Sequence, residues 1–197
     1  MANKSTLYQK TNYIYAYKQA VLQGATICCL ILLLMLTNDY LLDFLMLLFI
    51  VFDILSFFYT RDLNKCKQII EEQGSNVLYG CDQKGHTPLH WACLAGYNDV
   101  VKYFIECNAP VSKASNNELA PKPIHWACVN GHIVTVDILL QNGASIDVTD
   151  NRNCTPLIIA AQYGKTMLAG YLIGKGARKD LTDIDGDGAL HWAAFKG

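Results

Sequence analysis

The sequence predicts an all-α fold, a solenoid of stacked helix-turn-helix repeats that follows a hydrophobic membrane segment. Two observations support this prediction. A seven-residue block occurs four times in the last two thirds of the chain, and the first 60 residues carry only six charged side chains. Over all 197 residues, 16 Lys and Arg oppose 17 Asp and Glu. This near-neutral balance argues against a nucleic-acid binder, which usually presents a basic surface.

The first part of the chain divides into a polar segment, residues 1–18, and a hydrophobic segment, residues 19–59. Gln19 to Asn38 contains 20 consecutive uncharged residues, which matches the ~20 residues that one helix needs to cross a bilayer. We therefore expect a transmembrane helix here. The second apolar run, up to residue 59, contains Asp43 and Asp53, each of which costs roughly 2.5 to 3.5 kcal/mol at mid-bilayer.

Three arrangements of the hydrophobic segment remain open. It forms a tight membrane hairpin of two helices, or a single crossing whose second run lies at the interface or on the next domain, or a buried helical pair of a soluble protein. Because Lys and Arg favour the cytoplasmic side of membranes, a hairpin would leave the lysines of residues 1–18 and the basic residues after residue 60 in the cytosol. The prediction is a protein attached to a membrane with its repeats facing the cytosol.

The repeated block begins at Thr87 with Thr-Pro-Leu-His-Trp-Ala-Cys and returns after 35, 33 and 33 residues, at Lys122, Thr155 and Gly188. A glycine follows each block, at Gly96, Gly131, Gly164 and Gly197. A period near 33 with this motif is typical of ankyrin repeats. The pattern assigns residues 82–197 to three full repeats and one truncated repeat, and residues 60–81 to an opening half-repeat. Since the fourth repeat ends after its first helix, we expect a fragment or a truncated product.

Each residue type in the block has a physical reason. Proline at the first turn of a helix loses no bond that the helix would have used, and a preceding threonine can cap the exposed amides. Glycine releases the chain from the helix into a tight bend. The pattern assigns these structural roles to Gly96, Gly131 and Gly164. In ankyrin stacks the motif histidine ties neighbouring repeats together, and that role is expected of His90, His125 and His191.

The residue after the motif histidine is the variable position that faces the concave surface of an ankyrin stack. It is tryptophan in three repeats, at Trp91, Trp126 and Trp192, and isoleucine at Ile159. Large aromatic side chains dominate binding hot spots, so we expect protein partners to bind there, with Tyr97 as a weaker candidate. Simple packing between repeats is the alternative role for these tryptophans.

No constellation for catalysis or cofactor binding is found. The eight cysteines are scattered without a Cys-x-x-Cys pair, which favours free thiols over disulfides or a zinc site. No nucleophile, base and orienting group can be assembled around the histidines. Residues 183–188 match the first half of a calcium loop, but the twelfth position would be Ala194 instead of Glu. We therefore expect no catalytic residue, metal, cofactor or small-molecule ligand.

The chain resembles a narrower group of ankyrin proteins over about residues 52–197. The repeated Leu-His-Trp-Ala, residues 171–176 and residues 190–197 together look like the N-terminal ankyrin region of DHHC palmitoyltransferases of the huntingtin-interacting type. The resemblance implies that the repeats recruit protein substrates through extended peptides. It also implies a separate membrane part, bearing Asp-His-His-Cys, that transfers palmitate to a substrate cysteine.

Two departures from that group limit what is carried over. The peptide-contacting tryptophan falls on Trp126, but the accompanying asparagine falls on Ala95, so that hydrogen bond is absent. These residues also contain no Asp-His-His-Cys motif. The expected function is a membrane-attached module that binds partner proteins on its concave face. The alternative is the substrate-recognition part of a palmitoyltransferase, at the Golgi or another endomembrane, whose catalytic domain is missing here.

Overall fold

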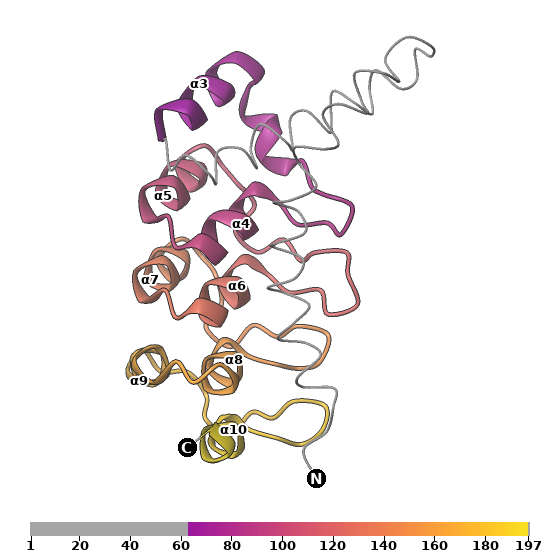
Figure 1. Cartoon of the computed structure of the whole chain (residues 1–197), viewed down its shortest axis with the longest axis vertical. Coiled ribbons are helices and arrows are strands. Elements are labelled where there is room, and N and C mark those ends of the chain that lie inside the picture. The colour runs from indigo at the N-terminus through magenta and orange to yellow at the C-terminus, as the bar shows by residue number, and fades with distance from the viewer. Residues whose placement is uncertain (1–62, 197) are drawn as a thin grey trace. The chain divides into compact units, whose positions relative to one another are not determined.

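The computed structural model describes residues 63–196 (Figure 1). The predicted polar segment 1–18, the predicted membrane segment 19–59 and the start of the opening half-repeat lie outside them. Within the described range, no helix is both long enough and apolar enough to cross a membrane.

The described chain is helical, and its helices come in the predicted pairs. The opening half-repeat contains α3 (Leu63–Gln73) and the 3-10 helix η1 (Ser75–Tyr79). The following repeats contain α4 (Pro88–Ala95) with α5 (Asn98–Glu106), α6 (Pro123–Asn130) with α7 (Ile133–Gln141), α8 (Pro156–Gln162) with α9 (Thr166–Gly174), and last α10 (Ala189–Lys196). Residues 63–196 contain no strand, only an isolated antiparallel bridge between Thr182 and Gly188. The all-α repeat fold is confirmed.

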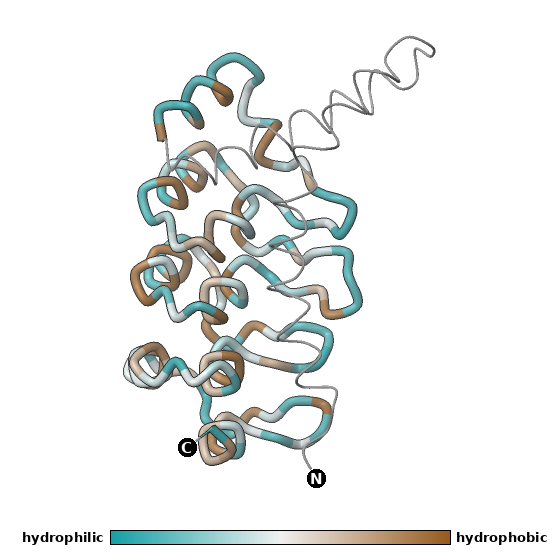
Figure 2. The backbone as a smooth tube through the Cα atoms, viewed as in Figure 1, coloured by the Kyte–Doolittle hydropathy of each residue, from teal (hydrophilic) through white to brown (hydrophobic). Residues whose placement is uncertain are grey.

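The helices stack in two rows (Figure 1). The first-helix row contains α4, α6, α8 and α10, and the second-helix row contains α3, α5, α7 and α9. Hairpin loops project from the first-helix row on the side away from the second. Figure 2 shows that most of these loops are hydrophilic, whereas apolar positions concentrate in the helices. The core lies between the two rows and is built from fully buried aliphatic and aromatic side chains: Leu89, Phe104, Ile124, Leu139, Leu157, Leu168 and Leu172.

Proline and glycine set the ends of the first helices. Pro88, Pro123 and Pro156 are the first residues of α4, α6 and α8, where a missing N–H costs nothing. The Thr155 hydroxyl caps α8 by accepting a hydrogen bond from the backbone N–H of Ile158 at 3.2 Å. At the other end, Gly96 has φ of 72°. A Cβ there would lie 2.5 Å from Nδ1 of His132, so both the backbone angle and the close approach require glycine.

The hairpin loops are shaped by one residue at an equivalent place in each repeat. Asp82, Asn117, Asp150 and Asp183 each accept, through Oδ1, two backbone N–H groups of the same loop at 2.8 to 3.1 Å. This is the Asx-turn role of short polar side chains. Adjacent loops are joined by backbone bonds, for example from Asn116 N–H to the Lys84 carbonyl at 2.8 Å. The loops therefore stack in register with the helices.

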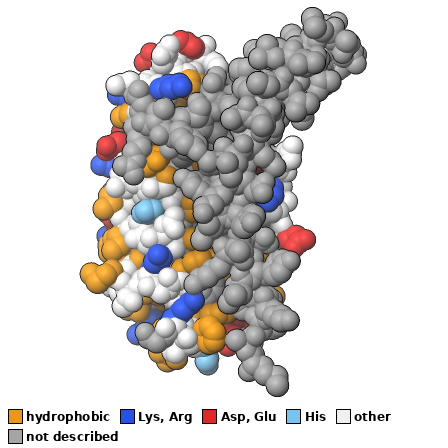
Figure 3. All heavy atoms as spheres, in the orientation of Figure 1, with side chains coloured by type: hydrophobic (Ala, Val, Ile, Leu, Met, Phe, Trp, Pro, Cys, Tyr) orange, Lys and Arg blue, Asp and Glu red, His pale blue; other side chains and the backbone are white. Residues whose placement is uncertain are grey.

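Apolar side chains are also exposed on the outside of the stack. Val134 and Met167, in the first turns of α7 and α9, are 55% and 79% exposed, and Figure 3 shows apolar side chains along the side of the second-helix row. In α10, no residue is buried. Its apolar residues Leu190 and Phe195 are 81% and 65% exposed.

Candidate partner-binding site

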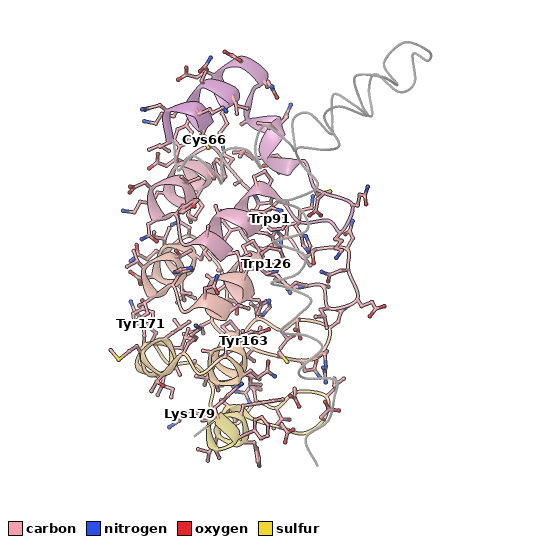
Figure 4. All side chains as sticks on the ribbon, viewed as in Figure 1. Cys66, Trp91, Trp126, Tyr163, Tyr171 and Lys179 are labelled. Carbon is pink, nitrogen blue, oxygen red and sulfur yellow. The ribbon has the colours of Figure 1, made fainter. Side chains whose placement is uncertain are left out.

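Trp91 and Trp126 lie next to each other in neighbouring first helices, α4 and α6 (Figure 4). Their ring centroids are 5.0 Å apart and their planes meet at 82°, the edge-to-face arrangement that aromatic pairs prefer. The ring of His86 lies 4.5 Å from Trp126 and 5.8 Å from Trp91, and His90 lies 5.7 Å from Trp126. We call these four residues the aromatic cluster.

Exposure differs strongly within the aromatic cluster. Trp126 is 4% exposed and His86 is 6% exposed, whereas Trp91 is partly exposed. The residue that the family resemblance marks for peptide contact is therefore almost entirely buried. Removing a buried tryptophan leaves a cavity that costs about 3 to 5 kcal/mol.

The motif histidines are fixed by backbone groups on both ring nitrogens. Nδ1 of His90 accepts the backbone N–H of Thr87 at 3.1 Å, so the proton is on Nε2, which donates to the carbonyl of Pro121 at 3.1 Å. His125 repeats this with Lys122 at 3.0 Å and the carbonyl of Val148 at 3.0 Å. Burial lowers the pKa of both histidines to about 4. They are neutral at physiological pH and link neighbouring repeats by hydrogen bonds.

The third motif histidine is in a different setting. His191 in α10 is exposed, and its Nδ1 accepts the backbone N–H of Gly188 at 3.1 Å. Trp192 lies apart from the aromatic cluster, and its indole N–H donates to the carboxylate of Asp183 at 3.1 Å. Between them in the stack, Ile159 is 7% exposed. The described structure thus joins two of the three predicted tryptophans, but not the third.

His86 is a member of the cluster that sequence reasoning missed. Its Nδ1 lies 2.8 Å from Oδ2 of Asp82, and its Nε2 lies 3.1 Å from Nδ2 of Asn117 in the next loop. Burial raises the pKa of Asp82, but hydrogen bonds from the His86 side chain and from backbone N–H groups outweigh this, so the pKa of Asp82 is lowered overall. The sequence offered one signal: histidine directly precedes the first repeated block, whereas the equivalent residues of the other repeats are Pro121, Cys154 and Asp187.

The other two predicted residues flank Trp91. Ala95 is the last residue of α4, four positions after Trp91 and therefore on the same face of the helix. Tyr97 immediately precedes α5. Both are partly exposed. None of the three side chains of Trp91, Ala95 and Tyr97 carries a charge.

Three buried thiols of the described repeats, Cys93, Cys128 and Cys154, are poor nucleophiles. Burial raises the pKa of Cys93 and Cys128 far above the ordinary value, and it raises the pKa of Cys154 to about 12. Thiolates are the reactive form, so these cysteines are inert at neutral pH. Residues 63–196 also contain no group of three or more His, Cys, Asp or Glu side chains that could hold a metal ion.

Comparison with known proteins agrees with this architecture. A family model described as ankyrin repeats (3 copies) matches residues 57–150 and 124–197. A protein of Danio rerio described as putative palmitoyltransferase ZDHHC13 is 32% identical over 134 residues, which is 68% of this chain. The match covers 20% of that relative, so the chain spans about a fifth of its length. The chain belongs to the ankyrin-repeat family.

Proposed function

We propose that these ankyrin repeats form a protein-interaction module whose binding surface is centred on Trp91. The observation that supports this most directly is the contrast within the aromatic cluster: a partly exposed indole at Trp91 rests against the buried rings of Trp126 and His86. A rigid aromatic side chain on a packed base loses little conformational entropy when it binds, which is the character of a hot spot. Ankyrin stacks offer extended surfaces of this kind to proteins.

The chemistry around Trp91 suits an extended peptide with apolar side chains. Ala95 and Tyr97 bring no charge to this surface, and Ala95 has no polar side-chain atom. A peptide here is therefore held by the indole and by shape, and not by a hydrogen bond from residue 95. Ala95→Asn would add the donor and acceptor that the related palmitoyltransferases are inferred to use.

The test is quantitative capture of proteins from a cell extract by the immobilised full chain and by two variants. Trp91→Ala is expected to lose the captured proteins, because it removes the central aromatic side chain. Val134→Ala on α7 is the matched control, since Val134 is 55% exposed but lies in the second-helix row. Equal capture by both variants, with unchanged circular dichroism, would exclude the surface at Trp91.

The second candidate function is substrate recognition within a palmitoyltransferase. It is favoured by the similarity to the Danio rerio protein described as a putative palmitoyltransferase. In that case we infer that another part of the protein transfers the acyl group, because burial raises the pKa of the Cys93, Cys128 and Cys154 thiols. Sequencing the transcript beyond the codon for Gly197 tests this: an Asp-His-His-Cys motif in frame supports it, and a stop codon excludes it.

We further propose that residues 19–59 attach the protein to a membrane and that the repeats face the cytosol. The support is the uncharged stretch from Gln19 to Asn38, which has the length of a membrane-spanning helix. Glycosylation acceptor sites engineered before residue 19 and within the repeats test the orientation. Modification of the site in the repeats would place them in the lumen and contradict the proposal.

A further inference from the structure

We propose that His86 is a positioning residue for the Trp91–Trp126 pair and that protonation of His86 rearranges this pair. The interaction site would then depend on pH through a histidine that contacts no partner. The inference deepens the proposed function, but its test observes the two indoles and no partner. A failure of this inference therefore differs from a failure of partner binding.

His86 lies where the first two hairpin loops and the first two repeats meet. Its ring is 4.5 Å from Trp126 in α6, 5.8 Å from Trp91 in α4 and 5.9 Å from His90. Only 6% of the residue is exposed. Because the imidazole contacts both indoles at once, its position helps to decide how the two indoles lie against each other.

Two hydrogen bonds assign the proton of His86. Asp82 Oδ2, 2.8 Å from Nδ1, is an acceptor when ionised, and it is ionised at neutral pH because its pKa is lowered by hydrogen bonds from His86 in spite of burial. Nδ1 therefore carries the proton and donates it. Nε2 is then an acceptor for the amide N–H of Asn117 at 3.1 Å. Both hydrogen bonds are therefore compatible with a neutral imidazole.

Asn117 cannot turn to accommodate a second proton on His86. Its Oδ1 accepts the backbone N–H groups of Leu119 and Ala120 at 3.1 and 2.9 Å, which fixes Nδ2 as the group that faces the imidazole. Protonation of Nε2 would set one N–H donor against another. Turning the amide would instead sacrifice two hydrogen bonds of the loop. In the first case the hydrogen bond between His86 and Asn117 is lost, and in the second case the loop loses two hydrogen bonds.

The backbones of the two hairpin loops beside His86 have little room to move. Asn116 N–H donates to the carbonyl of Lys84 at 2.8 Å, and a Cβ on Gly85 would lie 2.4 Å from Asn116 N. The two loops are thus already in close contact beside His86. The response must come from the imidazole, which keeps its bond to Asp82 and moves away from Asn117. That movement changes the packing against Trp126 and Trp91.

The charges around His86 are few within the described repeats. Asp82 in its own loop favours the protonated ring, while His90 in α4 stays neutral down to about pH 4, because burial lowers the pKa of His90 to about 4. Asn117 in the next loop and Trp126 in α6 contribute no charge. The Asp82 carboxylate therefore favours a charged ring and the Asn117 amide N–H opposes it, and either side chain can be changed by mutation.

The experiment uses the full chain carrying Trp192→Phe, so that the fluorescence of the remaining two of its three tryptophans comes from the pair. A protonated imidazole in contact with an indole quenches its fluorescence. We expect a sigmoidal loss of emission as the pH falls. His86→Gln should abolish it. His191→Gln, which changes a histidine outside the cluster, should leave it unchanged.

The variant Asn117→Asp is an independent test that leaves His86 unchanged. A carboxylate in place of the amide accepts a hydrogen bond from a protonated Nε2, so the midpoint of the fluorescence change should move to higher pH. The proposal is overturned if His86→Gln retains the sigmoid, if the Asn117→Asp midpoint does not rise, or if the far-UV circular dichroism is lost at the same midpoint. The last outcome would show unfolding and not a local rearrangement.

Discussion

Nε2 of His125 donates a hydrogen bond to the carbonyl of Val148, 3.0 Å away in the next hairpin loop. This bond exists only for the neutral ring whose Nδ1 accepts the backbone N–H of Lys122 at 3.0 Å. His90 makes the same connection to Pro121 one repeat earlier. The first three repeats are therefore joined by imidazoles that must remain unprotonated.

We predict that acid destabilises the repeats well above the range in which carboxylates titrate. The pKa of His90 and of His125 is about 4 in the folded chain, lowered by burial from 6.5. Below pH 6.5 these histidines bind protons in the unfolded chain but not in the folded chain. The free energy of unfolding that is present above pH 6.5 is therefore lost as the pH falls toward 4. Each histidine contributes a slope of about 1.4 kcal/mol per pH unit.

Urea unfolding followed by circular dichroism at pH 7.0 and 5.5 measures this slope. His125→Gln should reduce the slope by roughly half, although the variant is itself less stable. A free energy of unfolding that stays constant or rises between pH 7.0 and 5.5 would show that these histidines are not buried in their neutral form.

Gly96 and Gly164 should differ in their tolerance of alanine. Both have positive φ, 72° and 63°, which costs a non-glycine residue about 1 to 2 kcal/mol. A Cβ at Gly96 would also lie 2.5 Å from the ring of His132, whereas one at Gly164 meets nothing within 4 Å. Gly96→Ala is therefore expected to lower the melting temperature more than Gly164→Ala. Equal losses would contradict the close approach of His132.

Thr135→Val should destabilise the second-helix row without changing its shape. The hydroxyl of Thr135, a fully buried residue, donates to Oδ1 of Asn98 at 2.7 Å and joins α7 to α5. Valine has the same shape but leaves the Asn98 oxygen without this bond, at a cost of about 1 to 3 kcal/mol. Chemical denaturation measures the loss. Thr135→Ser keeps the hydroxyl and should lose less; a larger loss for serine would contradict the hydrogen-bond explanation.

Thr155→Ala should weaken the start of α8. The Thr155 hydroxyl accepts the backbone N–H of Ile158 at 3.2 Å, and losing such a cap costs about 1 kcal/mol. Thr155→Ser keeps the oxygen and is the matched control. If the alanine and serine variants melt at the same temperature, the hydroxyl does not cap the helix.

Much of the repeat architecture could be predicted because its signals are local. Pro123 in the first turn of α6 and Gly131, with φ of 79° after it, act through the conformation of a few neighbouring residues. A period of 33 to 35 residues then implies stacking. Residue identity was sufficient to predict the helix ends, since the backbone preferences of proline and of glycine do not depend on distant contacts.

The candidate site could be predicted only in part. Trp91 and Trp126 were found from their place in the motif, but the sequence did not indicate that one would be buried and the other partly exposed. His86 was not found at all. Its partners are Asp82, four residues away, and Asn117, 31 residues away, and no motif spacing connects the three.

The sequence by itself determined the class of fold and the prolines that begin α4, α6 and α8, because these follow from backbone preferences repeated at a nearly fixed period. Only the tertiary structure decided which aromatic side chain is accessible and which histidine supports it. The physical reason is that burial and hydrogen-bond partners are properties of the space between repeats. That space is formed by residues of different repeats, and the motif of a single repeat does not indicate which of them come into contact.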